Sequence, residues 1–325
     1  MPSSKRVLIA ASAVALVLTG CSSPADSPEA ADNGWHRTIE HAAGSTELTA
    51  RPTRIVSTSP SLTGSLLAIG APVVGSAATA ASGLTDDKGF FEQWAVVADE
   101  RGVGVVYDGL ALNLEAIQMY EPDLIIGSSN GGDSTLDAYD QLSAIAPTVL
   151  VDYGTPSWEE VTRELGTVTG LEDEADRVVD EYDAWTVEQA AKVALPNQPV
   201  TALVYLGADG VWAFTADSPQ GKLLTSLGFD YADIPEELQS ERQGASGVAV
   251  VSPENMSAAL ADTQTLFSVS MGPAGMESEL AADPLLANQP AVKNGAVFSL
   301  GTAAFRLDYY SAKQTVDLLI SAFGR

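Results

Sequence analysis

The sequence predicts an α/β protein with two lobes joined by a long helix, and three observations support this. The chain has 325 residues, enough for two domains that each have their own core. In both halves short apolar runs alternate with helix-prone segments, which is the pattern of parallel strands covered by helices. Between the halves, residues 172–192 are charged and helix-prone, and their apolar residues recur at helical spacing.

The N-terminal segment is typical of a bacterial lipoprotein signal. Lys5 and Arg6 precede an apolar run over residues 7–18, which is too short to span a bilayer but suits a signal-peptide core. The Leu-Thr-Gly before Cys21 resembles the bacterial lipobox, which implies that residues 1–20 are removed and that Cys21 is lipidated. The alternative is an ordinary signal peptide with a chance cysteine.

Charge and composition of the mature chain exclude several functions. Residues 21–34 hold little that could pack and are predicted to be a flexible tether. Signal removal takes two of the 16 basic residues and none of the 43 acidic ones, which leaves a net charge of −29. This charge argues against nucleic acid or an anionic membrane surface as a partner. Because Cys21 is the only cysteine, an intrachain disulfide or a cysteine-based metal site is excluded.

The first half of the folded part begins with a predicted pair of short strands over residues 35–51, around Ala43-Gly44-Ser45. Gly70 then ends the first predicted helix, as glycine commonly does. Further strands are expected over residues 54–58, 73–77, 123–127 and 148–151, and helices over residues 62–69, 113–120 and 139–145.

The second half repeats the alternation after the long helix, which the prolines at 196 and 199 end. Strands are expected over residues 200–206, 248–251, 265–269 and 296–300, and helices over residues 220–227, 253–261 and 309–323. The predicted limits are 35–168 for the first lobe, 169–196 for the connecting helix and 197–325 for the second lobe.

Several stretches are more specific than this pattern: RIVSTSPSLTGSLLAI from residue 54, DDKGFFEQW from 86, EAIQMYEPDLIIG from 115, the run over 132–147, and FRLDYYSA from 305. Together they resemble the helical-backbone (class III) periplasmic binding proteins for iron chelates, and within that family most of all those for ferric enterobactin. The resemblance covers nearly all of residues 47–325. It implies two Rossmann-like lobes, a rigid connecting helix and a ligand cleft between the lobes.

The implied ligand is a ferric catecholate siderophore, a large anion with aromatic faces. Its capture requires cations that bind catechol oxygens and aromatic side chains that cover the rings. The siderophore fills the coordination sphere of the iron, so we expect no protein ligand to the metal and no resident cofactor. The expected partners are the permease and ATPase of an ABC importer and the membrane, through the lipid anchor. We expect a monomer.

The mature chain has few cations, so candidates for the cleft can be found by elimination. Most cations lie on early strands or on exposed helix faces, which leaves four in loop contexts: Lys88, Arg101, Arg242 and Arg306. Arg306 is the strongest, because it follows a strand beside Phe305 and matches the arginine of the family motif. Its alternative role is a salt bridge to Asp308. The alternative for Arg242 is a solvated loop charge.

Two further aromatic residues are candidates for the cleft. Trp212 is placed in a glycine-flanked loop and matches the family's cleft tryptophan; the alternative is a core residue. Tyr107 lies in the corresponding loop of the first lobe, where cleft and core are equally favoured. The chain departs from the family over residues 81–85, where a cation is replaced by Ala-Ser-Gly-Leu-Thr. Lys88 or Arg101 could substitute, or the ligand differs.

Glu115 and Glu254 each begin a predicted helix, one in each lobe. A carboxylate in the first turn stabilises a helix by itself. In the resembled family, glutamates at these positions form salt bridges to arginines of the permease. One residue can serve both purposes, so both roles stay open.

Other functions have less support. The only histidines, His36 and His41, lie in the predicted N-terminal strands, which argues against a zinc or manganese site. Without a further histidine or cysteine, most nucleophile–base catalysis is excluded, and we expect no enzyme. The alternatives kept open are a hydroxamate or citrate siderophore, haem or cobalamin as the ligand, and a lipid-anchored enzyme or cell-wall interaction domain.

Overall fold

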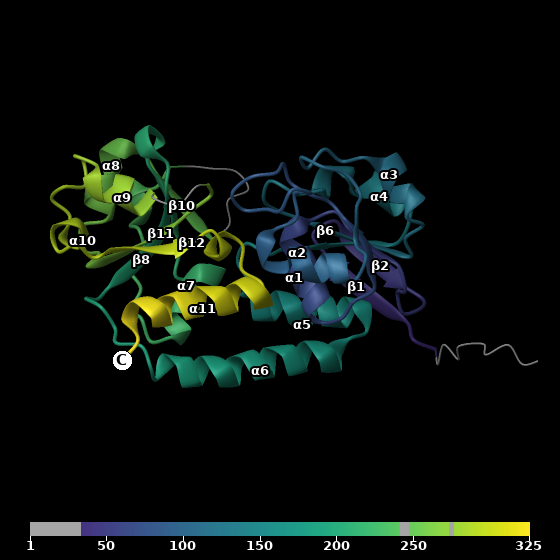
Figure 1. Ribbon diagram of the computed structural model, residues 1–325. Helices are drawn as coiled ribbons and strands as arrows, with labels where there is room; N and C mark the ends of the chain where they lie inside the picture. The colour runs from purple at the N-terminus through teal and green to yellow at the C-terminus, as the bar shows by residue number, and fades with distance from the viewer. Residues whose placement is uncertain (1–33, 241–246, 273–275) are drawn as a thin grey trace, which may run out of the picture. The chain divides into compact units, whose positions relative to one another are not determined.

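The computed structural model describes residues 34–240, 247–272 and 276–325, and in these ranges two five-stranded sheets are flanked by helices (Figure 1). This confirms the predicted α/β class with two lobes. The first lobe contains the sheet that comes first in the sequence, and the second lobe contains the other sheet. The predicted signal peptide, Cys21 and the tether up to residue 33 lie outside the described residues. Within the described ranges, no helix combines the length and apolarity that a membrane span requires.

The chain enters the first lobe through an antiparallel pair, β1 (Arg37–His41) and β2 (Gly44–Leu48), as predicted. Thr46 attaches this pair to the sheet, because its hydroxyl donates to the backbone oxygen of Thr148 over 2.6 Å. His41 bonds the Thr46 hydroxyl at 2.9 Å and also contacts the ring and the hydroxyl of Tyr139. Among the described residues, no group of three His, Cys, Asp or Glu side chains is placed to hold a metal ion.

The first sheet is entirely parallel. Its strands are β3 (Ile55–Ser57), β4 (Val73–Ser76), β5 (Gly104–Val105), β6 (Leu124–Ser128) and β7 (Thr148–Val151). The spatial order β5-β4-β3-β6-β7 is that of a doubly wound fold, with the switch point between β3 and β6. Ligands of such sheets bind outside the carboxyl ends of the strands at the switch point, so the residues after β3 and β6 are placed for binding.

The helices of the first lobe are α1 (Pro60–Ala68), α2 (Glu92–Glu100), α3 (Leu114–Met119), the 3₁₀ turn η1 (Leu136–Ala138), α4 (Tyr139–Ser143) and α5 (Trp158–Thr169). The sequence analysis did not predict α2 as a helix. Its first residue follows Phe91 without a side-chain cap, so the usual start signal is missing. The helix is stabilised instead by the burial of one face, with Trp94, Ala95 and Ala98 packed in the hydrophobic core.

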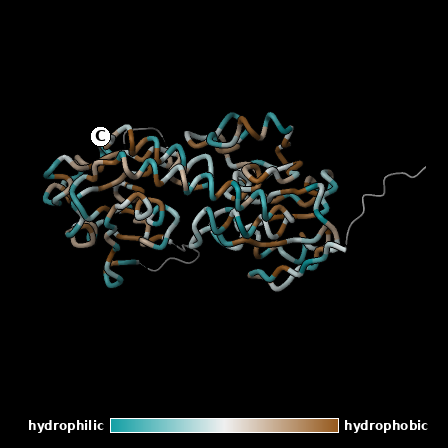
Figure 2. The backbone as a smooth tube through the Cα atoms, turned by 90° about the horizontal axis from the view of Figure 1, so that it is seen from below, coloured by the Kyte–Doolittle hydropathy of each residue, from teal (hydrophilic) through white to brown (hydrophobic). Residues whose placement is uncertain are grey.

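The predicted long helix is α6 (Glu172–Ala190), which begins two residues after Gly170 ends α5 with a left-handed φ of 74°. It packs against α5 and against α11 (Tyr309–Phe323). Since α11 also contacts α1 and α2, helices from both lobes pack against one another. Along these helical turns hydrophobic and hydrophilic residues alternate, as Figure 2 shows.

The second sheet is mixed, with the order β10-β9-β8-β11-β12. Its strands are β8 (Val200–Tyr205), β9 (Val211–Phe214), β10 (Val248–Val251), β11 (Thr265–Val269) and β12 (Val297–Gly301). The prediction of parallel strands fails at β9, which is antiparallel to β8 and β10. Only residues 206–210, which include the short turn η2 (Gly207–Asp209), separate β8 from β9, and so short a connection permits a hairpin but no parallel crossover.

The remaining elements of the second lobe cover this sheet and lead to its C-terminal helix. They are α7 (Pro219–Ser226), the 3₁₀ turn η3 (Glu236–Leu238), α8 (Pro253–Ala259), α9 (Met276–Ala282), α10 (Pro290–Lys293) and the 3₁₀ turn η4 (Ala303–Phe305). The segment from β12 through η4 to α11 matters for function, because it carries Phe305 and Arg306 to the first lobe.

Candidate functional site

A cavity of about 270 Å³ is lined by residues of both lobes. The first lobe contributes, among others, Ser61 after β3 and Asp133 after β6, and the second lobe contributes Phe305 and Arg306. The cavity therefore lies at the switch point of the first sheet, where a doubly wound fold binds its ligand. Largely apolar walls with a few charged groups are the usual composition of a small-molecule site.

Among the described residues that line this cavity, Arg306 is the one with a positive charge. Its guanidinium carbon lies 4.2 Å from the ring centroid of Phe305 and 5.5 Å from that of Tyr153, both within cation–π range. Among the described residues, no carboxylate forms an ion pair with Arg306. The guanidinium donates to the backbone oxygen of Phe305 over 3.2 Å. The guanidinium thus contacts two aromatic rings, and no carboxylate of the described residues neutralises its charge.

The alternative partner Asp308 has a different task. Its side chain caps α11 by accepting bonds from the backbone nitrogens of Tyr310 and Ser311, at 2.8 and 2.9 Å. Complete burial raises the pKa of Asp308 to about 6, although these hydrogen bonds oppose the shift. Asp308, two residues after Arg306, therefore fixes the start of α11 at Tyr309.

The first lobe holds this segment directly. From α2, the side-chain amide of Gln93 donates to the backbone oxygen of Arg306 at 3.3 Å and to the carboxylate of Asp308 at 3.4 Å. In α1, Gly64 leaves room for the Asp308 carboxylate, because a Cβ there would collide with it and with Trp94. The backbone of Arg306 is therefore positioned by helices of the opposite lobe.

Asp133 and Tyr153 also belong to the site, although the sequence analysis did not select them. Asp133 is 7% exposed, and its carboxylate accepts bonds from the hydroxyls of Ser59 (2.5 Å) and Tyr153 and from the backbone nitrogen of Ser61 (3.4 Å). Burial raises the pKa of Tyr153, with the negative charge of Asp133 adding to the shift. One signal could have found both residues, since each follows a predicted strand at its carboxyl end.

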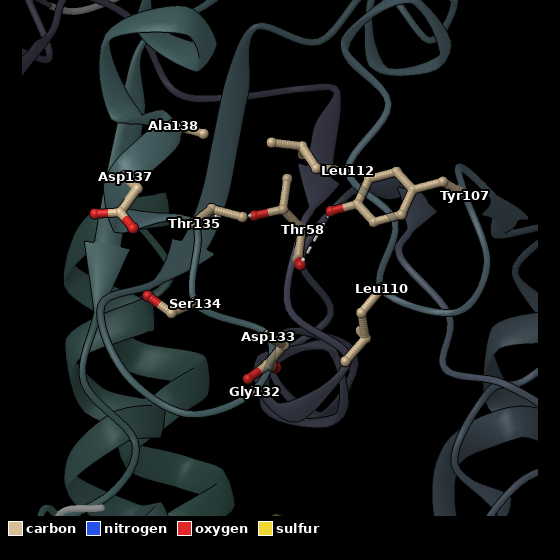
Figure 3. Close-up of a pocket in the computed structure, with 10 residues that line it drawn as sticks. All are labelled: Thr58, Tyr107, Leu110, Leu112, Gly132, Asp133, Ser134, Thr135, Asp137 and Ala138. Atoms are coloured by element: carbon tan, nitrogen blue, oxygen red, sulfur yellow. Dashed lines mark hydrogen bonds between the residues drawn. The ribbon is translucent and has the colours of Figure 1, made fainter. Parts of the chain in front are cut away.

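Tyr107 lines a smaller cavity of about 90 Å³ next to the first one (Figure 3). Leu110, Gly132 and Asp133 line both cavities, so the two adjoin. The Tyr107 hydroxyl donates to the backbone oxygen of Thr58 over 3.3 Å, and burial raises its pKa. Its side chain is 8% exposed and packs in a hydrophobic core cluster of the first lobe, so the core reading of Tyr107 holds and its role in a ligand cleft stays a prediction.

Trp212 does not lie in a loop, as the sequence analysis expected, but in β9, where it pairs with Val204 and Val250. The loop prediction is wrong because Gly207 and Gly210, with φ of 62° and 92°, complete the reversal before Val211. The Trp212 side chain is half-buried against the core of the second sheet.

The two candidate substitutes for the missing cation of the first lobe have partners within that lobe. Lys88 pairs with Asp99, and this hydrogen bond is the largest cause of its raised pKa. Arg101 donates to the backbone oxygen of Leu67 over 2.6 Å near the end of α1. Neither is among the described residues that line the Arg306 cavity. Arg242 lies outside the described residues.

Glu115 and Glu254 are both exposed, in the first turns of α3 and α8. The cap of α3 is supplied by Asn113, whose side chain accepts a bond from the backbone nitrogen of Ala116 at 3.0 Å. Met119, one turn after Glu115 on the same face of α3, is 84% exposed. The capping side chain of α3 is therefore that of Asn113, and the Glu115 side chain remains exposed.

Sequence comparison with known proteins supports the resemblance to the periplasmic binding proteins for iron chelates. The chain is 43% identical over 316 residues to the ferric enterobactin-binding periplasmic protein FepB of Escherichia coli O6:H1. This alignment covers 95% of this chain and 97% of FepB. It is 28% identical over 289 residues to the probable siderophore-binding lipoprotein YfiY of Bacillus subtilis, covering 86% of this chain and 85% of YfiY.

Solved structures share the fold over most of the chain. Holo-ViuP has a TM-score of 0.83 and 32% identity, covering 90% of this chain and 96% of ViuP. Staphylococcus aureus SirA complexed with staphyloferrin B has a TM-score of 0.67 and 26% identity, covering 88% of this chain and 96% of SirA. The family model described as periplasmic binding protein matches residues 55–304, which is more than half of the sequence. The chain therefore belongs to the periplasmic binding protein family.

Proposed function

We propose that this protein binds a ferric siderophore of the catecholate type and delivers it to an ABC importer for iron uptake. The observation that carries the proposal is Arg306, a guanidinium with no carboxylate partner among the described residues, in a cavity lined by both lobes. The relative that is 43% identical is named for ferric enterobactin, and SirA was solved in complex with staphyloferrin B.

The chemistry of the cavity suits an anionic, aromatic chelate. A guanidinium donates charge-assisted hydrogen bonds to catecholate oxygens, and Phe305 and Phe91 present apolar rings in the same cavity. In the proposed complex the siderophore keeps all coordination positions of the iron, so the protein requires no resident cofactor. The binding lobes need not catalyse any reaction, because the ATPase of the importer supplies the energy of transport.

A neutral ferric hydroxamate is the second candidate ligand. The observation in its favour is the first-lobe wall, where Ala80, Ser82 and Leu84 line the cavity without a cation. A single guanidinium does not neutralise a trianion, so a less charged chelate would meet a better-matched site.

The proposed organisation places the binding body outside the cytoplasmic membrane. Lipid on Cys21 would anchor it, residues 21–34 would be the tether, and the lobes would comprise residues 35–168 and 197–325 around the connector at 169–196. Glu115 and Glu254, exposed on different lobes, would contact arginines of the two permease subunits. A monomer suffices for this arrangement.

Titration of tryptophan fluorescence tests the ligand class, because the five tryptophans report on both lobes. The mature protein is titrated with ferric enterobactin, ferrichrome, ferric citrate, haem and cobalamin. We expect ferric enterobactin to change the emission at the lowest concentration, in the sub-micromolar range. Saturable binding of a non-catecholate alone would disprove the proposed ligand class.

A further inference from the structure

We infer that Tyr153 determines the ligand specificity of the cavity by keeping Arg306 and Asp133 from forming an ion pair. The inference rests on the proposed function, because it concerns how the same cavity selects an anion. Arg306 and Asp133 are opposite charges that line one cavity, yet no ion pair joins them. Such a pair would occupy the cation that an anionic ligand needs.

The carboxylate of Asp133 is held on the side of the first lobe. One of its oxygens accepts the Ser59 hydroxyl at 2.5 Å and the backbone nitrogen of Ser61 at 3.4 Å, and these two residues lie at the start of α1. The other oxygen accepts the hydroxyl of Tyr153. A buried carboxylate is stable only when donors surround it, and Tyr153 is the side-chain donor to the oxygen that Ser59 and Ser61 leave free.

The Tyr153 side chain contacts both charged residues, Asp133 through its hydroxyl and Arg306 through its ring. Its hydroxyl donates to Asp133, while its ring lies 5.5 Å from the guanidinium carbon of Arg306, which comes from the other lobe. Phe305 adds a second ring at 4.2 Å from the same carbon. Because burial raises the pKa of Tyr153, the residue stays a neutral donor at physiological pH.

The backbone at Gly131 passes close to the Tyr153 hydroxyl and helps to keep this side chain in place. Gly131 has a left-handed φ of 78°, and a Cβ at this position would collide with the Tyr153 hydroxyl. The loop that carries Asp133 can therefore pass next to the ring. Without the hydroxyl, one oxygen of Asp133 loses this donor and the nearby guanidinium becomes the strongest alternative.

The test compares Tyr153→Phe with the wild type for an anionic probe, ferric enterobactin, and a neutral one, ferrichrome. Tyr153→Phe keeps the ring and removes only the donor. We expect the dissociation constant for ferric enterobactin to rise about tenfold, the usual size of a lost hydrogen bond to a charged group. The ratio of the affinities for the two probes should fall accordingly, which a general loss of packing would not cause.

A second substitution provides the rescue. In Tyr153→Phe/Asp133→Asn the competing carboxylate is gone, so affinity for ferric enterobactin should return to within about twofold of the Asp133→Asn single variant. Asp133→Asn alone should bind ferric enterobactin at least as tightly as the wild type, because it removes a negative charge from the cavity. Weaker binding by that folded variant, or no rescue in the double variant, would overturn the inference.

A matched control is Tyr231→Phe, which removes a buried hydroxyl bonded to the backbone oxygen of Phe214 at 2.8 Å. It should lower the melting temperature and leave the ratio of affinities unchanged. If Tyr153→Phe behaves like this control, Tyr153 is only structural and the inference is wrong. A wild type that does not bind ferric enterobactin at all would instead refute the proposed function, so the two failures are distinguishable.

Discussion

The guanidinium carbon of Arg306 lies 5.5 Å from the ring centroid of Tyr153, although the two residues belong to different lobes. The contact joins the second lobe's cation to the switch point of the first sheet, because Tyr153 follows β7 and bonds Asp133, which follows β6. The cavity is therefore complete only when both lobes contribute to it, and changes at either side should alter binding.

Loss of the Arg306 guanidinium should weaken anionic ligands specifically. Arg306→Ala is expected to raise the dissociation constant for ferric enterobactin about 10- to 100-fold, since charge-assisted hydrogen bonds contribute about 1.5–3 kcal/mol. Arg177→Ala, on the exposed face of α6, serves as the control and should bind normally. Unchanged affinity after Arg306→Ala, measured by fluorescence titration, would remove this residue from the site.

Gly64 should be essential for packing between the lobes. A Cβ at Gly64 would collide with Asp308 and would lie 2.8 Å from Trp94, so Gly64→Ala should lower the free energy of unfolding by about 1–3 kcal/mol. Gly272→Ala is the control, because no atom of the described residues lies within 4 Å of its added Cβ and its φ is not left-handed. Denaturant unfolding measures both variants, and equal losses would contradict the packing argument.

The raised pKa of Asp308 predicts a pH dependence of stability. Its pKa is about 6 in the folded protein against 3.8 for the reference group, so the folded state holds the proton more tightly than the unfolded state. The contribution of Asp308 is therefore most favourable below about pH 4 and is lost as the pH rises through about 6. The difference between the two pKa values corresponds to a loss in the free energy of unfolding on the order of 2–3 kcal/mol, at about 1.4 kcal/mol per pKa unit.

Comparison with Asp308→Asn isolates this contribution, because asparagine can still cap α11. The free energy of unfolding of the wild type minus that of the variant should fall between pH 4 and pH 7. A difference that stays constant, or rises, over this range would show that the carboxyl is not destabilised by burial.

The two exposed glutamates should matter for transport and not for ligand binding. Glu115→Lys/Glu254→Lys is expected to abolish siderophore uptake by cells and to leave the dissociation constant of the purified protein unchanged, since neither residue lines the described cavities. Glu236→Lys/Glu237→Lys, on the exposed turn η3, is the charge-matched control. Normal uptake with the first double variant would rule out the docking role.

The sequence predicted the elements whose local signals are strong. The last helix was expected over residues 309–323 and is α11 (Tyr309–Phe323), because Asp308 caps it and an apolar face continues through its length. Arg306 and Phe305 were likewise expected together, and they line one cavity. In both cases the information lies within a few neighbouring residues.

Other features depend on contacts between distant segments and could not be found in this way. Asp133 and Tyr153 become a pair only after β6 and β7 align, and the contact of the Tyr153 ring with Arg306 requires the second lobe. The strand β9 was missed because four residues between a turn and a loop give little periodicity. The helix α2 lacks a capping signal and is fixed by the burial of Trp94.

A crystal structure of the protein with ferric enterobactin bound tests the central claim most directly. The account predicts that the catecholate oxygens lie within hydrogen-bond distance of the Arg306 guanidinium, with Phe305 against a ring and the iron coordinated by the siderophore alone. A protein oxygen or nitrogen bound to the iron, or a chelate seated away from Arg306, would contradict it.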